Sequence, residues 1–187
     1  LYAQRESLPT WRGHNEQTMA HAAIAFAKAS KRQSTMAVTS SIGPGALNMV
    51  TACGLAHVNR LPVLFIPGDV FANRAPDPVL QQIESFQNGD WSANDTLRPV
   101  TRYFDRITRA EQILTALPRA ISVMTDPANC GPVCLALPQD VQTHAFDCPE
   151  DFLQPDLIRF RRPPADEREL DRAAHLLKSS KRPLIIA

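Results

Sequence analysis

A carboxylate at the start of a helix is the residue of this sequence best suited to proton transfer. Glu16 follows Asn15, a good N-cap residue, and opens an alanine-rich stretch whose apolar residues recur at helical spacing. The helix dipole favours the ionised form of a carboxylate in the first turn, whereas burial beside a ligand raises its pKa. A carboxylate under these opposed influences suits general acid–base work. The alternative is that Glu16 only caps the helix.

A glycine–proline–glycine turn is the second stretch whose residue types point to chemistry. Gly43, Pro44 and Gly45 separate a short β-branched run from an alanine-rich stretch that contains Asn48. Most such turns are only turns. A phosphate-binding loop is disfavoured, because the turn lacks the lysine of a P-loop and the third glycine of a dinucleotide fingerprint.

The histidines and cysteines give weaker evidence for a catalytic or metal-binding site. His14 lies close to Glu16 and could serve as a second acid or base, although a histidine in a turn is more often structural. The four cysteines form no C-x-x-C pair, and the five histidines show no zinc-type spacing with them. We therefore predict no metal site within this chain, and expect reduced thiols in a cytoplasmic protein.

Alternating elements surround these residues. Helices are predicted over 15–30, 46–59, 109–124 and 165–180, and strands over 35–40, 61–66, 100–104 and 131–138. A short helix after Pro76 is predicted to contain Gln81 and Gln82, followed by a loop over 85–97. This order predicts an α/β fold, a doubly wound parallel sheet with helices on both faces. Ligands of such sheets lie beyond the carboxyl ends of the strands, where the Gly43–Gly45 turn and Pro67–Asp69 are placed.

Composition excludes several classes of protein. The chain has 187 residues, 44% of them hydrophobic, and a net charge of +1 with scattered lysines and arginines. Neither a nucleic-acid surface nor a polybasic membrane contact is indicated. No apolar run approaches the roughly 20 residues of a membrane span, and the first residues do not resemble a signal peptide.

Both ends of the sequence suggest a piece of a longer polypeptide. There is no initiator methionine, and the last residues, 182–187, resemble the start of a buried strand. We expect a domain over 1–144 that lacks its N-terminal strand, a linker over 145–168 and the start of a further domain over 169–187.

A family resemblance joins these motifs. The ordered set resembles the pyrimidine-binding domain of thiamin diphosphate enzymes over nearly all of residues 10–142, and the acetohydroxyacid synthase branch is the closest large group. Its members are Arg12…Glu16-Gln17, Gly43-Pro44-Gly45…Asn48, Pro62-Val63…Gly68 and Gly131-Pro132-Val133…Pro138-Gln139-Asp140-Val141.

Finer features depart from the synthases. They are the extra Ile42 and the segments 74–82 and 98–107. These segments resemble family members that hydrolyse a carbon–carbon bond of a cyclic trihydroxy-1,2-dione in myo-inositol breakdown. The resemblance therefore implies a small polyol-derived dione as substrate. Two alternatives remain: a carboligase or decarboxylase of the acetolactate synthase type, or a non-catalytic α/β interaction domain, which an exposed Glu16 far from the turn would indicate.

The resemblance implies roles for individual residues. Glu16 would be catalytic, by hydrogen bonding the cofactor's pyrimidine N1′ and so promoting the imino tautomer that removes the thiazolium C2 proton. Gly43, Pro44 and Gly45 would let the backbone approach the pyrimidine, since glycine has no Cβ, and Asn48 would brace the turn. The candidate substrate-facing residues are His14, Gln81, Gln82 and Arg102.

The resemblance also implies what lies elsewhere. Mg²⁺ and diphosphate ligands would come from a separate domain, usually of another subunit of a homo-oligomer, so this chain alone would be inactive. Some relatives hold FAD, but no residue here indicates a flavin site. Gly68-Asp69…Asn94 superficially matches the Mg²⁺ motif Gly-Asp-Gly…Asn, but Val70 replaces the second glycine and the match is interpreted as a coincidence.

Overall fold

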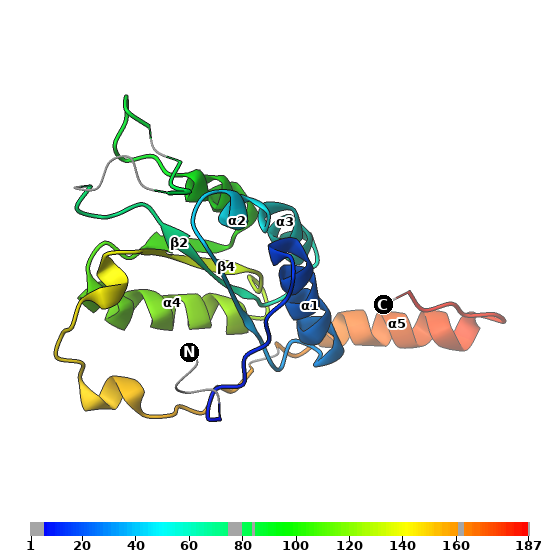
Figure 1. Cartoon of the computed structure of the whole chain (residues 1–187). Helices are drawn as coiled ribbons and strands as arrows, with labels where there is room; N and C mark the ends of the chain where they lie inside the picture. The colour runs from blue at the N-terminus through cyan, green and yellow to red at the C-terminus, as the bar shows by residue number, and fades with distance from the viewer. Residues whose placement is uncertain (1–5, 75–79, 84, 161–162, 187) are drawn as a thin grey trace.

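A four-stranded sheet forms the centre of the molecule (Figure 1). The computed structural model describes residues 6–74, 80–83, 85–160 and 163–186. The strands are β1 (Ala37–Ser40), β2 (Leu64–Asp69), β3 (Tyr103–Arg106) and β4 (Val133–Pro138), in the order β1-β2-β4-β3. Every neighbouring pair is parallel, which confirms the predicted parallel sheet.

Apolar side chains explain why β2 and β4 are central. Val133, Cys134, Leu135 and Ala136 of β4 are all buried, as expected for a strand covered on both faces. β2 lies between β1 and β4, with Leu64 opposite both Ala37 and Val133. The carboxyl ends of all four strands therefore meet at one edge of the sheet.

Helices cover both faces, as predicted. On one face, α1 (Glu16–Ala29) and α3 (Val50–Val58) bury stripes of small residues in one hydrophobic cluster with the sheet. On the other face, α4 (Ile113–Thr125) packs Ala116, Ala120 and Met124 against β4 in a second cluster (Figure 1). Small side chains let α1 approach the sheet closely, which fixes the position of its first turn.

Two predicted elements near the site differ in detail. The predicted helix over 46–59 is divided into α2 (Pro44–Leu47) and α3, with Asn48 and Met49 between them. Pro67–Asp69 was predicted to follow β2 but lies inside it, because Gly68 and Asp69 pair with Leu137 and Pro138 of β4. Pairing to a central strand thus overrides the turn preference of proline and glycine.

The segment between β2 and β3 differs most. The predicted helix at Gln81 and Gln82 is absent from the described part of this segment: Gln81 has a left-handed φ of 65° and lies in a turn, while residues 75–79 lie outside the described residues. The predicted loop over 85–97 ends in a 3-10 helix, η2 (Ala93–Val100), which a capping box between Ser92 and Asp95 stabilises. Because η2 extends to Val100, β3 begins at Tyr103 rather than at residue 100.

Short 3-10 turns precede α4 and follow β4. α4 begins at Ile113 after η3 (Ala110–Gln112) and contains Pro118. Further 3-10 turns are η4 (Val141–Thr143) and η5 (Glu150–Leu153).

The last helix, α5 (Glu167–Ser179), extends away from the sheet with all its residues exposed (Figure 1). The predicted strand near the end does not form over residues 183–186, since no neighbouring strand is there to pair with it. Among the described residues, no helix is long and apolar enough to cross a membrane. The division of the chain into a domain over 1–144, a linker over 145–168 and the start of a further domain over 169–187 remains a prediction.

Candidate functional site

The N-terminus of α1 places Glu16 at the carboxyl edge of the sheet. Asn15 has an extended φ of −152°, and its side chain accepts a hydrogen bond of 3.1 Å from the Thr18 backbone N–H. This cap fixes where the first turn begins, as the sequence predicted. Glu16 itself is half-buried, so its carboxylate is available for contacts outside its own helix.

Glu16 and Asn48 are in direct contact. The Asn48 side-chain amide donates a hydrogen bond of 3.0 Å from Nδ2 to Glu16 Oε2. This bond is the main cause that lowers the pKa of Glu16, with a contribution from the Glu16 backbone N–H, and together they outweigh the raising effect of burial. The carboxylate is therefore ionised at neutral pH and poised to accept a proton or a hydrogen bond.

Gly45 packs closely beside the carboxylate. A Cβ at Gly45 would lie 2.5 Å from Ser41 Oγ and 3.4 Å from Glu16 Oε1. Gly45 is buried, and the Ser41 hydroxyl lies too close for a Cβ to fit without a shift. Glycine therefore lets the backbone of the turn lie directly against Ser41 and the Glu16 carboxylate.

Gly43 shapes the turn itself. Its φ of +68° belongs to the left-handed region, and a Cβ at this position would collide with the backbone oxygen of Gln81. Pro44 follows at the first position of α2, where its fixed φ suits a helix start. Gly68 of β2 lies behind the turn, since a Cβ there would be 3.1 Å from the Ile42 nitrogen. The turn is thus held from both sides by backbone.

The other predicted substrate residues are placed differently from one another. His14 is exposed just before α1. Gln81 contributes its backbone to the contact with Gly43, and its side chain is exposed. Gln82 accepts a hydrogen bond of 3.3 Å from the Phe71 backbone N–H, and its buried Nε2 atom has no hydrogen-bond partner among the described residues. Gln82 Nε2 is therefore an oriented donor near the turn.

Arg102 is not brought to the site. It immediately precedes β3, and its backbone N–H bonds to Pro132 just before β4. The amino ends of the parallel strands form the edge opposite to the one that carries Glu16. The prediction placed Arg102 inside a strand over 100–104, and the later start of β3 moves it to the far edge.

A network around Arg106 was missed by sequence reasoning. Its Nε atom lies 2.7 Å from Asp69 Oδ2, and its Nη2 atom lies 2.7 Å from Ser92 Oγ and 3.1 Å from Asp95 Oδ1. Burial lowers the pKa of Arg106, but the pairing with Asp69 and Asp95 outweighs it and raises the pKa. The sequence signal was the Ser-x-x-Asp capping box together with opposite charges at two strand ends.

Gly68, Asp69 and Asn94, which superficially match the Mg²⁺ motif, lie close together, but their contacts are with other protein groups. Asn94 is 1% exposed and donates a hydrogen bond of 2.7 Å to the Gly68 carbonyl. Asp69 is fully buried and its carboxylate is paired with Arg106, so it is not free to bind a cation. Within the part of the chain that the structure describes, no group of three or more histidine, cysteine, aspartate or glutamate residues could hold a metal.

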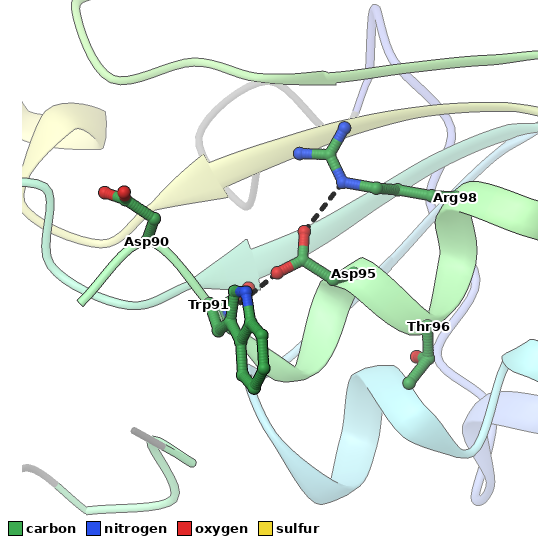
Figure 2. A pocket seen from close by; sticks show the side chains of 6 residues that line it. Asp90, Trp91, Asp95, Thr96 and Arg98 are labelled. Atoms are coloured by element: carbon green, nitrogen blue, oxygen red, sulfur yellow. Dashed lines mark hydrogen bonds and ion pairs between the residues drawn. The ribbon is translucent and has the colours of Figure 1, made fainter. Parts of the chain in front are cut away.

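A shallow hollow lies beside η2 (Figure 2). Asp95 lies between the Trp91 indole and the Arg98 guanidinium, 2.8 Å from Arg98 Nε. The Arg98 guanidinium also stacks 4.2 Å from the centre of the Phe104 ring. The residues lining this hollow are Asp90, Trp91, Ser92, Asp95, Thr96 and Arg98. Neither Glu16 nor the glycine turn belongs to it.

The geometry places a carboxylate, the amide that bonds it and a glycine turn side by side, and a comparison with known protein families agrees with this arrangement. Residues 2–89 match the family described as thiamine pyrophosphate enzyme, N-terminal TPP binding domain. The match includes Glu16, the glycine turn and β2. This part of the chain is therefore similar to the N-terminal domain of thiamine pyrophosphate enzymes, in agreement with the resemblance found in its motifs.

The chain is also similar to individual proteins of known name. The chain is 49% identical over 186 residues to the 3D-(3,5/4)-trihydroxycyclohexane-1,2-dione hydrolase of Clostridium perfringens. This alignment covers 100% of the chain and 29% of the relative. Enzymes of the same name from Clostridium tetani and Bacillus subtilis are each 50% identical over 179 residues, covering 96% of this chain and 28% of the relative. The chain thus spans less than a third of the length of these relatives.

Proposed function

We propose that this chain supplies the pyrimidine-binding part of a thiamin-diphosphate-dependent hydrolase. The reaction is cleavage of a carbon–carbon bond that opens a cyclic trihydroxy-1,2-dione in myo-inositol degradation. The observation that carries the proposal is the contact of Glu16 with Asn48 beside the backbone of the glycine turn at Gly45. The names of the relatives support the choice of reaction.

The residues present fit an aminopyrimidine ring. At Gly45 the turn presents bare backbone beside the ionised Glu16 carboxylate, where a Cβ would lie 3.4 Å from Oε1, and a flat ring is proposed to lie against this backbone. Thiamin diphosphate, when bound, supplies a carbanion-forming ring carbon that adds to a substrate carbonyl.

The chain's own residues have simpler tasks. Glu16 accepts or shares a proton at a pyrimidine nitrogen, and Asn48 orients its carboxylate. The backbone of the Gly43–Gly45 turn forms the wall against which the ring lies. Such positioned proton transfer contributes about 10²–10⁴-fold to a rate.

The diphosphate and Mg²⁺ are proposed to bind outside this chain. The described residues contain no cluster of three or more metal-ligating side chains, and Asp69 is occupied by Arg106. A homo-oligomer in which another subunit supplies these ligands, located in the cytoplasm, is part of the proposal. Calorimetry of the 187-residue chain with thiamin diphosphate and Mg²⁺ should therefore detect no tight binding, and a micromolar dissociation constant would contradict this division of labour.

The substrate is proposed to meet the segment after β2. A ring with several hydroxyls needs hydrogen-bonding partners, because each buried hydroxyl left unpaired costs about 1–3 kcal/mol. Gln82 offers a buried Nε2 donor that has no partner in the part of the chain that the structure describes, and His14 and the Gln81 side chain are exposed beside the same edge of the sheet. Arg102 lies at the opposite edge and is left out of the proposed substrate site.

The structure bears differently on the two alternative functions, a non-catalytic interaction domain and a carboligase or decarboxylase. An interaction domain without catalysis would be indicated by an exposed Glu16 far from the turn, whereas Glu16 is half-buried and bonded to Asn48. A carboligase or decarboxylase would use the same Glu16 chemistry, so it differs only in substrate.

A chimeric enzyme tests the proposal. This chain replaces the matching 28% of the Bacillus subtilis relative, and the product is assayed with the cyclic dione and with pyruvate. Ring opening without acetolactate formation is the expected result. Acetolactate formation without ring opening would instead assign the chain to the carboligases.

A further inference from the structure

The two oxygens of the Glu16 carboxylate have different surroundings. Oε2 accepts the hydrogen bond of 3.0 Å from Asn48 Nδ2. Oε1 lies 3.4 Å from the position that a Cβ would occupy at Gly45. Oε2 is therefore tied to Asn48, whereas Oε1 faces the backbone of the glycine turn.

Asn48 is itself held by the glycine turn. It ends α2 with helical φ and ψ of −66° and −17°, and its backbone N–H donates to the Pro44 carbonyl at 3.1 Å. The next residue, Met49, is fully buried in the core. The residue that contacts Glu16 thus ends the same short helix that contains Gly45, and its hydrogen bond joins this helix to the carboxylate at the start of α1.

The structure assigns Asn48 a positioning role: it holds Oε2 of Glu16, so that Oε1 alone is presented to a flat heterocycle lying over Gly45. We propose this role in place of direct contact between Asn48 and the cofactor. The identity of the heterocycle rests on the proposed function.

An asparagine suits this task better than an ionisable residue. Its amide is a neutral donor at every pH, so it orients the carboxylate without competing for the proton that Glu16 exchanges. The same hydrogen bond is the main cause of the lowered pKa of Glu16, which keeps the carboxylate ionised before a ligand arrives. An aspartate of the same shape would remove the donor and add a like charge.

An NMR titration of the 187-residue chain tests the inference without any cofactor. The Glu16 carboxyl carbon is followed with pH in the wild type, in Asn48→Ala and in Asn48→Asp. The pKa of Glu16 should rise in Asn48→Ala and rise further in Asn48→Asp. Asn59→Ala is the matched control, because Asn59 also ends a helix and donates 2.9 Å to the Leu55 carbonyl, yet its variant should leave the Glu16 titration unchanged.

The outcomes separate the inference from the proposed function. An unchanged Glu16 titration in both folded Asn48 variants overturns the positioning role. In the chimera, thiazolium C2 proton exchange should slow about 10–100-fold in Asn48→Ala, by analogy with residues that orient metal ligands. Unchanged exchange in Glu16→Gln would instead overturn the proposed function, and with it the part of the inference that names a heterocycle.

Discussion

Two groups of charged side chains lie at the carboxyl edge of the sheet, and they differ in how fully their hydrogen-bonding capacity is used. Around Arg106, the guanidinium contacts Asp69, Asp95, Ser92 Oγ and the Asp90 carbonyl at 2.7–3.1 Å. Around Glu16, the described residues supply one side-chain hydrogen bond, from Asn48 to Oε2, and Oε1 faces the backbone of Gly45.

The difference separates stability from function. Buried charges must be paired to be tolerated, so the saturated Arg106 network is expected in the fold and offers little to a ligand. A half-buried carboxylate with one oriented oxygen is suited to a group that arrives later. Charge density alone would favour the Arg106 cluster, whereas remaining hydrogen-bonding capacity beside the glycine turn favours Glu16 as the proposed ligand-binding group.

The largest expected effect is on the Glu16 side of the comparison. In the chimera, Glu16→Gln should slow thiazolium C2 proton exchange by about 10²–10⁴-fold, because an amide cannot share a proton with the pyrimidine. The thermal midpoint should stay close to that of the wild type. Exchange that stays at the wild-type rate would reduce Glu16 to a residue of the helix start.

Arg106→Met should give the opposite pattern. It leaves the Asp69 carboxylate buried without its partner, which should lower the free energy of unfolding by about 3–5 kcal/mol. Urea denaturation of the 187-residue chain measures this loss.

Arg109→Met is the matched control for that variant, since Arg109 is 78% exposed and lies 3.8 Å from Glu111. Its effect should stay below about 1 kcal/mol. Equal losses in the two arginine variants would contradict the structural role of the Arg106 network.

Replacing each of the two glycines of the turn should affect a different property, stability at Gly43 and cofactor binding at Gly45. Gly43→Ala places a Cβ against the Gln81 carbonyl at a φ of +68°, so it should cost about 1–3 kcal/mol of stability. Gly45→Ala meets the movable Ser41 hydroxyl within a helix, so its stability should change by less than about 1 kcal/mol while the chimera loses cofactor binding. Denaturation of the chain and calorimetry of the chimera measure the two effects, and a stable, fully active Gly45→Ala would argue against a ring at this position.

The smallest effect concerns acid stability through Asp140. Burial raises its pKa, but backbone N–H groups of Ala72 and Asn73, at 2.9 Å and 3.1 Å, outweigh it and lower the pKa. A lowered folded-state pKa contributes stability above about pH 4 that is lost as the pH falls further. Asp140→Asn should therefore cost about 1–2 kcal/mol at pH 7, and the difference from wild type should shrink at pH 3.

Asp90→Asn is the control for the pH dependence. The Asp90 side chain is 91% exposed in its ion pair with Arg74, so salt and solvent screen it. Urea denaturation at both pH values should show a smaller and flatter difference for this variant. A constant difference for Asp140→Asn at both pH values would contradict the linkage.

The sequence predicted the features that depend on local chemistry. Asn15 caps α1 with an extended backbone, so a short-range signal placed Glu16 correctly. The apolar run of β4 and the alanine stripe of α1 predicted the parallel sheet and its covering helices, because burial on both faces requires such residues. The proximity of Glu16 to the turn was implied by the family resemblance.

The features that the sequence did not predict depend on distant partners. Gly68 and Asp69 continue β2 only because β4 lies beside them, and this pairing is not local. The three-residue shift of β3 moved Arg102 to the opposite edge, which a periodicity argument cannot resolve for a short strand. The choice of Oε2 as the oxygen bonded to Asn48 requires coordinates, although the capping box at Ser92 was readable and overlooked.

Glu16, Gly45 and Asn48 are proposed to receive the pyrimidine of thiamin diphosphate. A crystal structure of the chimera with the cofactor bound tests this role most directly. We expect a pyrimidine nitrogen within about 3 Å of Glu16 Oε1, the ring against Gly45, and Asn48 Nδ2 still on Oε2. A pyrimidine bound away from Glu16 and Gly45 would contradict the proposed role.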